Sequence, residues 1–181
     1  MAQYNGYVPV AHVTYQAFRN ATLGNGYNVD YEFGNQCWDF CALLWWQYGL
    51  TLYTGTNGIA EECWTQSRER NAVTPFTSFT GVENILRGDV CVFAGTTSYP
   101  TGHIAFADED YQSGENTMRF LGQNQGQGTS APSNLAVLPI TNIIGIFRNT
   151  YWNASPPTPP TPTADDKKRK YPWAIALQNW Y

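Results

Sequence analysis

The sequence predicts an α+β domain in which N-terminal helices pack on a small antiparallel β-sheet. Two apolar, helix-like segments lie in the first half, at about residues 8–20 and 36–48, and the second half contains short runs bounded by Gly, Ser, Asn and Asp. Helices followed by antiparallel strands are typical of α+β domains. A length of 181 residues suits one domain with a short appendage.

Each helical segment has its own signature. Between Val8 and Asn20, the apolar residues Val10, Val13 and Phe18 recur on roughly one side. The segment from Gln36 to Tyr48 is apolar around most of its circumference and is followed by Gly49, which suits a helix C-cap, so we expect a central, buried helix. Residues 50–80 are rich in turn residues, with a short helix expected at about residues 60–69.

The strands are expected after the Arg87-Gly88-Asp89 turn. Short apolar runs bounded by turn residues predict them at Val90–Ala94, His103–Ala107, Thr117–Gln123 and Ile143–Arg148. The intervening Ser113–Asn116 stretch suits a hairpin connection, which favours antiparallel pairing.

The composition changes after the predicted domain, which covers residues 1–150. Residues 151–163 are rich in Pro and Thr and predict a stiff polyproline II linker. Residues 164–181 form a tail with four consecutive basic residues, Lys167 to Lys170, and several aromatic ones. We interpret this tail as a docking segment or as the start of a further region.

Charge and composition exclude some partners. The net charge is −4 and the pI is about 5.0, without a long basic run before the tail, which argues against a nucleic-acid partner. The first residues lack the charged and apolar regions of a signal peptide, and we expect no secretory signal and no membrane-spanning helix. Aromatic residues make up 15% of the chain, which fits either core packing or a stacking surface.

Four cysteines form neither a metal-ligand spacing nor a disulfide framework. We interpret Cys41, Cys63 and Cys91 as small buried apolar residues. Cys37 differs because it stands where the second helix is expected to begin. Exposed N–H groups at a helix start lower the pKa of a thiol, which favours a nucleophilic role over a structural one.

A thiol, an imidazole and an amide follow one another along the chain. Cys37 would be the nucleophile, His103 at a strand start the base, and Asn124 at a strand end the group that orients the imidazole. The simpler interpretation is a buried cysteine and a half-buried histidine. His12, the other histidine, is interpreted as a surface or packing residue.

Five motifs follow one another along the chain: Asn35-Gln36-Cys37-Trp38-Asp39, Arg87-Gly88-Asp89-Val90, Gly102-His103-Ile104-Ala105-Phe106, Leu121-Gly122-Gln123-Asn124 and Ile144-Gly145-Ile146-Phe147-Arg148. Together they resemble the CHAP family, the cysteine- and histidine-dependent amidohydrolases and peptidases that cut bacterial peptidoglycan and are common in phage lysins. The resemblance covers roughly residues 8–150 and implies a papain-like α+β fold, a Cys37 nucleophile and a His103 base.

One position departs from the family pattern. Many members have Glu-Gln-Asn where this chain has Gly122-Gln123-Asn124, so a carboxylate beside the imidazole is missing and turnover could be slower. Asn124 is kept, which leaves a Cys-His-Asn triad possible. Similarity to papain-like sites also suggests that Gln36 and the Cys37 backbone N–H form the oxyanion hole.

The loop before Cys37 carries alternating oxygen donors, which suit Ca²⁺. In some phage CHAP domains a calcium site lies here, which implies a ligand set in this chain made of Asn28, Asp30, Glu32, Gly34 and Asp39. Glu32 and Gly34 would contribute backbone carbonyls. The alternative is a solvated polar loop. No organic cofactor is expected.

The expected function is peptidoglycan hydrolysis in a Gram-positive cell wall, by a phage tail- or virion-associated lysin. The substrate would be a peptide stem or bridge, cut by an N-acetylmuramoyl-L-alanine amidase or an endopeptidase, in a groove with Trp38, Tyr99 or Trp64. The tail segment would dock on other virion tail proteins. The alternatives are a structural virion protein with a degenerate CHAP domain, a free endolysin located in the host cytoplasm before lysis, and an intracellular thiol protease.

Overall fold

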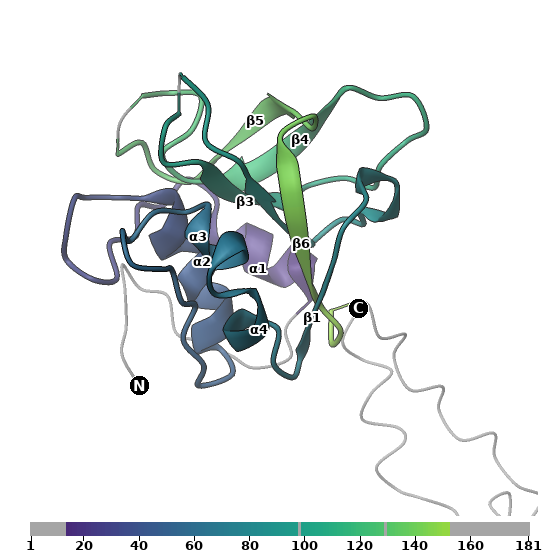
Figure 1. The fold of residues 1–181 in the computed structure, drawn as a ribbon. Coiled ribbons are helices and arrows are strands. Elements are labelled where there is room, and N and C mark those ends of the chain that lie inside the picture. Colours follow the sequence, from purple (N-terminus) through teal and green to yellow (C-terminus); the bar gives the residue numbers. More distant parts are fainter. Residues whose placement is uncertain (1–13, 98, 129, 153–181) are drawn as a thin grey trace, which may run out of the picture.

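The computed structural model describes residues 14–97, 99–128 and 130–152, and it confirms the α+β prediction. The longer helices come first along the chain, and most of the strands follow them (Figure 1). The helices are α1 (Tyr15–Thr22), α2 (Cys37–Trp46), α3 (Glu62–Thr65), α4 (Arg68–Asn71) and the 3₁₀ turn η1 (Val82–Asn84). The strands are β1 (Phe76–Phe79), β2 (Val90–Phe93), β3 (His103–Ala107), β4 (Thr117–Gly122), β5 (Asn134–Pro139) and β6 (Ile143–Asn149).

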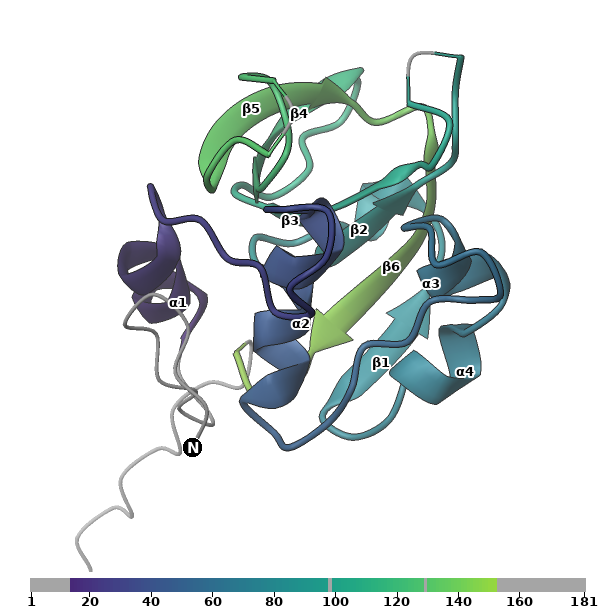
Figure 2. The ribbon, with the colours of Figure 1, turned by 90° about the vertical axis from the view of Figure 1, so that its left-hand side faces the viewer.

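The strands form one antiparallel sheet with the order β1-β6-β2-β3-β4-β5. The two views show α1 and α2 on one side of this sheet, with α3 and α4 beside its β1 end (Figures 1 and 2). The start of β3 is held by β2, because Phe93 pairs with His103. The sheet therefore fixes the backbone of the predicted base.

The predicted strands are found in place, but two strands were missed. β3 has the predicted bounds, and β2, β4 and β6 each differ from the prediction by one residue at one end. β1 lies in the segment expected to consist of turns, and β5 was not expected at all. The short helix predicted near residues 60–69 is divided into α3 and α4.

Helix α2 is the central, buried helix that its composition predicts. Phe40, Leu43 and Leu44 are fully buried in it. Its partner strand β3 is also buried on both faces: Ile104 and Phe106 belong to the apolar cluster around α2, whereas Ala105 and Ala107 belong to a second cluster on the opposite side of the sheet. Because β3 is packed on both faces, it fixes the position of the start of α2 relative to the end of β4.

All four cysteines are free and buried. Cys41, Cys63 and Cys91 have no exposed surface, in agreement with a packing role. None of the helices within the described ranges has the length and apolar character needed to span a bilayer.

Packing extends slightly beyond the predicted domain boundary. Trp152, assigned to the linker from the sequence, is buried and its ring lies 5.7 Å from that of Tyr15 and 5.4 Å from that of Phe18. Residues 153–163 of the predicted linker, the tail 164–181, His12 and the predicted helix start at Val8 lie outside the described residues.

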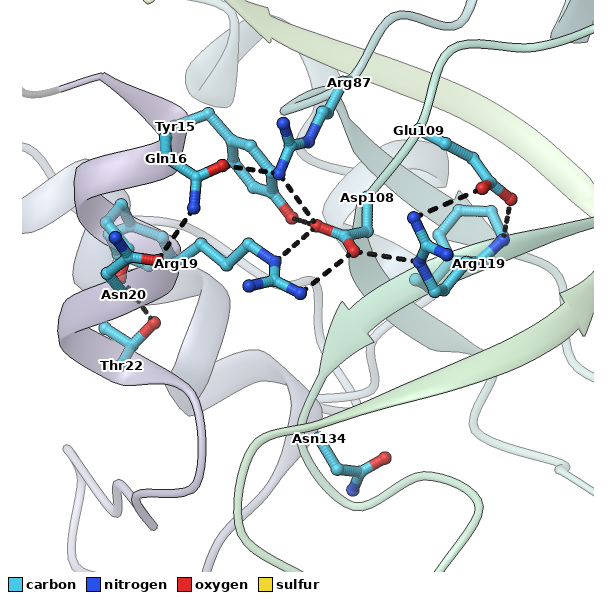
Figure 3. Close-up of polar contacts among 12 residues, drawn as sticks. Tyr15, Gln16, Arg19, Asn20, Thr22, Arg87, Asp108, Glu109, Arg119 and Asn134 are labelled. Carbon is cyan, nitrogen blue, oxygen red and sulfur yellow. Dashed lines mark hydrogen bonds and ion pairs between the residues drawn. The ribbon is translucent and has the colours of Figure 1, made fainter.

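Asp108, just after β3, joins α1 to the sheet (Figure 3). Its buried carboxylate accepts hydrogen bonds from Tyr15 Oη at 2.8 Å, Arg19 Nε at 2.7 Å and Arg119 Nε at 3.0 Å. Burial raises the pKa of this carboxyl, but the donors outweigh it and leave the pKa below its usual range. The contact therefore anchors α1 on the opposite end of β3 from His103.

Candidate active site

Cys37 is the first residue of α2, as its sequence context predicts. The helix start is capped by Asp39, whose carboxylate accepts the Gln36 backbone N–H at 2.8 Å and the Val29 N–H at 2.8 Å. Backbone N–H groups in a first helical turn have no intrahelical acceptor. The Cys37 side chain is 9% exposed and lies among these groups.

The Cys37 thiol is held in its protonated form. Burial raises its pKa to about 11, although the nearby backbone N–H groups of Ile104 and Trp38 act in the opposite direction. A thiol in this state needs a base to become a nucleophile. Its contact with the amide of Ile104 places it at the beginning of β3, next to His103 in the sequence.

His103 is the first residue of β3 and is partly buried. Its Nε2 atom lies 2.9 Å from Oε1 of Gln125, and its ring is 5.8 Å from that of Phe93. Burial lowers the pKa of the imidazole, while the contact with Gln125 acts in the opposite direction. The pKa remains below its usual value, which favours a neutral imidazole near pH 7.

The hydrogen bonds of the Asn124 side chain go to partners other than His103, which differs from the expectation. Its Nδ2 donates to Oε1 of Gln36 at 2.9 Å, and its Oδ1 accepts the Ser130 N–H at 2.9 Å. The contact expected from Asn124 is made by Gln125 instead. The reason is local: Asn124 has a φ of +55°, a left-handed conformation that turns the chain directly after β4.

Gln36 is oriented from two sides. Its Oε1 accepts from Asn124 and its Nε2 donates to the Phe33 carbonyl at 2.6 Å. One hydrogen of this Nε2 is not engaged by the Phe33 carbonyl, so the amide retains a donor for an oxyanion.

Gln123 and Gln125 were given no role from the sequence, although Gln123 belongs to one of the five family motifs. Gln123 is fully buried and donates to the carbonyls of Tyr27 at 2.7 Å and Gln36 at 2.9 Å. Together with Asn124 these residues form three consecutive amides: Gln123 and Asn124 both donate to Gln36, at its carbonyl and at its side chain, whereas Gln125 contacts His103. A run of three amides directly after a strand is a signal that could have drawn attention to both glutamines.

A pocket of about 230 Å³ opens beside the imidazole. Its lining is mostly apolar, with His103 and Gln125 on one side, and Cys37 is not part of its wall. Of the three aromatic residues expected near substrate, Tyr99 lines this pocket. Trp64 instead packs against Phe147, with ring centroids 5.4 Å apart, and Trp38 packs against the core.

The loop before α2 carries the residues of the calcium prediction, which stays a prediction. Asn28 Oδ1 is buried without a hydrogen-bond partner. Burial, with a smaller contribution from the charge of Asp30, raises the pKa of Asp39 to about 6. An unpaired buried oxygen and two carboxylates within residues 28–39 are ligand types that Ca²⁺ accepts. Competing contacts exist, because Asp30 Oδ1 accepts the Glu32 N–H at 2.9 Å and Asp39 caps α2.

Carboxylate, histidine and cysteine side chains alone do not make a metal site here: in the described parts of the chain, no three of them gather around one point. A calcium ion would therefore depend on Asn28 and on backbone carbonyls of the loop in addition to Asp30 and Asp39. Backbone carbonyls are ordinary Ca²⁺ ligands, so the residues present fit the ion.

A buried helix with a cysteine in its first turn, packed on an antiparallel sheet whose central strand begins with histidine, defines a papain-like α+β domain. The chain belongs to the CHAP family: the CHAP domain family model matches residues 25–124. This match confirms the resemblance inferred from the five motifs. It includes Cys37, His103 and Asn124 and ends just before Gln125.

Comparisons with individual proteins agree with the family. A D-alanyl-L-alanine endopeptidase of Streptococcus phage B30 is 38% identical over 130 residues, which are 70% of this chain and 28% of that protein. The fold is similar to that of the wild-type endolysin LysIME-EF1, with a TM-score of 0.61 and 21% identity over 75% of this chain and 64% of the endolysin. Ly7917 is similar with a TM-score of 0.50 and 16% identity over 76% of this chain and 62% of that chain. The chain thus spans about a quarter of the phage endopeptidase's length.

Proposed function

We propose that this protein is a peptidoglycan hydrolase that cleaves a peptide bond by cysteine nucleophilic catalysis. The observation that carries the proposal is the position of Cys37 at the start of α2, against the backbone amide of Ile104, the residue that follows His103, within a CHAP domain. The simpler interpretation of a structural cysteine explains burial but not the helix-start position or the buried amide network around Gln36.

The proposed mechanism is acyl transfer through a thioester. His103 takes the thiol proton as Cys37 Sγ attacks the amide carbonyl, and then gives that proton to the leaving amine. A water molecule, deprotonated by His103, attacks the thioester and releases the acid product. Burial keeps the Cys37 thiol protonated and the His103 imidazole neutral, so the imidazole is in the state that accepts the thiol proton.

The oxyanion formed in each step would be stabilised by the Cys37 backbone N–H and the free hydrogen of Gln36 Nε2. Gln36 is suited to this role because Asn124 and the Phe33 carbonyl fix its amide. Preorganised donors of this kind are worth about 10²–10³-fold in kcat.

Among the possible bonds, we favour a peptide bond after a small uncharged residue, as in an endopeptidase. The phage B30 relative is named for a D-alanyl-L-alanine bond. The mostly apolar pocket beside His103, with Phe93, Tyr99 and Leu138 in its wall, suits a methyl side chain better than a charged one. An amidase would instead have to place a muramoyl group at this end of the cleft.

Calcium binding is also proposed, with Asn28, Asp30 and Asp39 and the carbonyls of Glu32 and Gly34 as ligands. The ion would order the loop that leads into α2. The unpaired Asn28 oxygen supports this assignment.

The test is mass spectrometry of fragments released from purified Gram-positive peptidoglycan. An endopeptidase cuts within the peptide and leaves a new carboxyl end on an amino-acid residue, whereas an amidase releases intact stem peptides and leaves the new carboxyl on the muramoyl group. The Cys37→Ala variant is the control. Absence of fragments from the wild-type protein, with and without Ca²⁺, would contradict the proposed function and favour the structural virion protein.

A role in the virion, with docking through residues 164–181 on tail proteins, is a separate proposal. It predicts that the protein is recovered from purified phage particles, whereas a free endolysin is found only in the lysate.

A further inference from the structure

The contact between His103 and Gln125 involves a residue outside the CHAP family match and outside the motifs that indicated the family. Gln125 is 4% exposed, and its Oε1 atom lies 2.9 Å from His103 Nε2. The partner of the imidazole is therefore a neutral amide instead of a carboxylate.

The orientation of this amide is determined by its other contacts. Gln125 Nε2 lies 3.1 Å from the Phe120 carbonyl and 3.1 Å from the Asn134 carbonyl, and both contacts are buried. Two carbonyls require the two N–H donors, so the oxygen must face His103. An oxygen can only accept, which means that His103 carries its proton on Nε2 and keeps the Nδ1 lone pair free.

Position 122 explains how Gln125 reaches this place. A Cβ atom at Gly122 would lie 2.5 Å from Gln125 Oε1, 2.9 Å from its Cδ and 3.1 Å from Ala105 Cβ. A side chain at position 122 and the present conformation of Gln125 therefore exclude each other. With glycine at position 122, no side chain from that position can contact the imidazole, and Gln125 can contact it instead.

We propose that Gln125 is the positioning residue of His103, holding the Nε2-protonated tautomer so that Nδ1 serves as the base, and that Gly122 is small in order to admit it. The proposal rests on the proposed function in that it assigns His103 as the base. Two other titratable residues contact the chain neighbours of His103: the Cys37 thiol lies against the backbone amide of Ile104, and Glu61, whose carboxylate accepts the Gly95 N–H at 2.6 Å, lies against Gly102.

The first test reads the tautomer and needs no activity. The chain has two histidines, so ¹⁵N NMR of the imidazoles, with a His12→Gln variant for assignment, isolates His103. We expect a single Nε2-protonated tautomer with a slowly exchanging Nε2 proton. In Gln125→Leu this proton should exchange faster and the tautomer should become mixed. Gln127→Leu, an exposed residue of the same loop, is the matched control. An Nδ1-protonated His103, or an unchanged spectrum in Gln125→Leu, would overturn the proposal.

The second test measures the activity of single and double variants at positions 122 and 125. Gln125→Leu should lower kcat/KM about 10–100-fold, because an oriented hydrogen bond to a group that becomes charged is lost. Gly122→Glu should also lose activity, since both side chains compete for one space. Gly122→Glu with Gln125→Ala should recover activity, and the acid limb of its pH profile should lie about 1 pH unit above that of wild type, because a carboxylate raises the imidazole pKa.

Thermal unfolding identifies variants that lose activity only because they are unfolded. These variants are set aside, and the tautomer of His103 in the folded wild-type protein then decides the proposal. Equal losses in the single Gly122→Glu variant and in a folded double variant would contradict the proposal. A wild-type protein that is inert on peptidoglycan but shows the expected His103 tautomer would contradict the proposed function while leaving the positioning contact established.

Discussion

Asn124 donates a hydrogen bond of 2.9 Å to Oε1 of Gln36, the residue immediately before Cys37. The bond connects the chain after β4 to the start of α2, and Asn124 Oδ1 is held in turn by the Ser130 N–H at 2.9 Å. Asn124 thus acts on the oxyanion side of the proposed site, while Gln125 acts on the imidazole side.

This division of roles predicts the effect of replacing Asn124. Asn124→Gly keeps the left-handed backbone without strain but releases the Gln36 amide. We expect kcat to fall about 3–10-fold, the value of one neutral hydrogen bond, with the His103 NMR signals unchanged. Loss of the His103 Nε2 proton signal in this variant would show that Asn124 orients the imidazole after all.

The pH dependence of activity follows from the buried imidazole. Catalysis needs neutral His103, and burial lowers its pKa below the ordinary value of 6.5. The active form therefore persists to lower pH, and the acid limb of kcat/KM should lie below pH 6.5. A pH profile combined with NMR titration of His103 measures both quantities, and a limb above this value would contradict the assignment.

Acid stability should depend on Asp108. Its pKa in the folded protein is below the ordinary 3.8, so its contacts contribute stability at neutral pH that is lost as the pH falls below this value. Asp108→Asn should cost about 2–4 kcal/mol at pH 7 in urea unfolding and reduce this acid sensitivity. Glu109→Gln is the control, because its side chain is 36% exposed and should cost about 0.5 kcal/mol or less. Equal effects of both changes would contradict the account.

Calcium binding should strengthen when Asn28 becomes an acid. Asn28→Asp adds a third carboxylate beside Asp30 and Asp39, and carboxylate number raises Ca²⁺ affinity. We expect Ca²⁺ to raise the Tm of the wild type and to do so at lower concentration in Asn28→Asp. Asn25→Asp adds the same charge at an exposed position outside the set. If the wild type and Asn28→Asp each unfold identically with Ca²⁺ and with a chelator, the calcium site is excluded.

Local patterns predicted most of the fold. The apolar segment of α2 and the short apolar run of β3 are strong enough to place both elements, and with them Cys37 and His103. β1 and β5 were missed because Phe76–Phe79 is short and surrounded by turn residues, and because β5 is mostly half-exposed. The partner of His103 could not be predicted, since it depends on the left-handed turn at Asn124 and on the space left by Gly122.

The most direct test of the central claim is the initial rate of peptidoglycan solubilisation by wild-type protein and by Cys37→Ala at equal concentrations of folded protein. Removal of the nucleophile should reduce the rate at least about 10³-fold, to the level of buffer alone. Equal rates for the two proteins would contradict the assignment of Cys37 and, with it, the proposed cysteine-dependent hydrolysis.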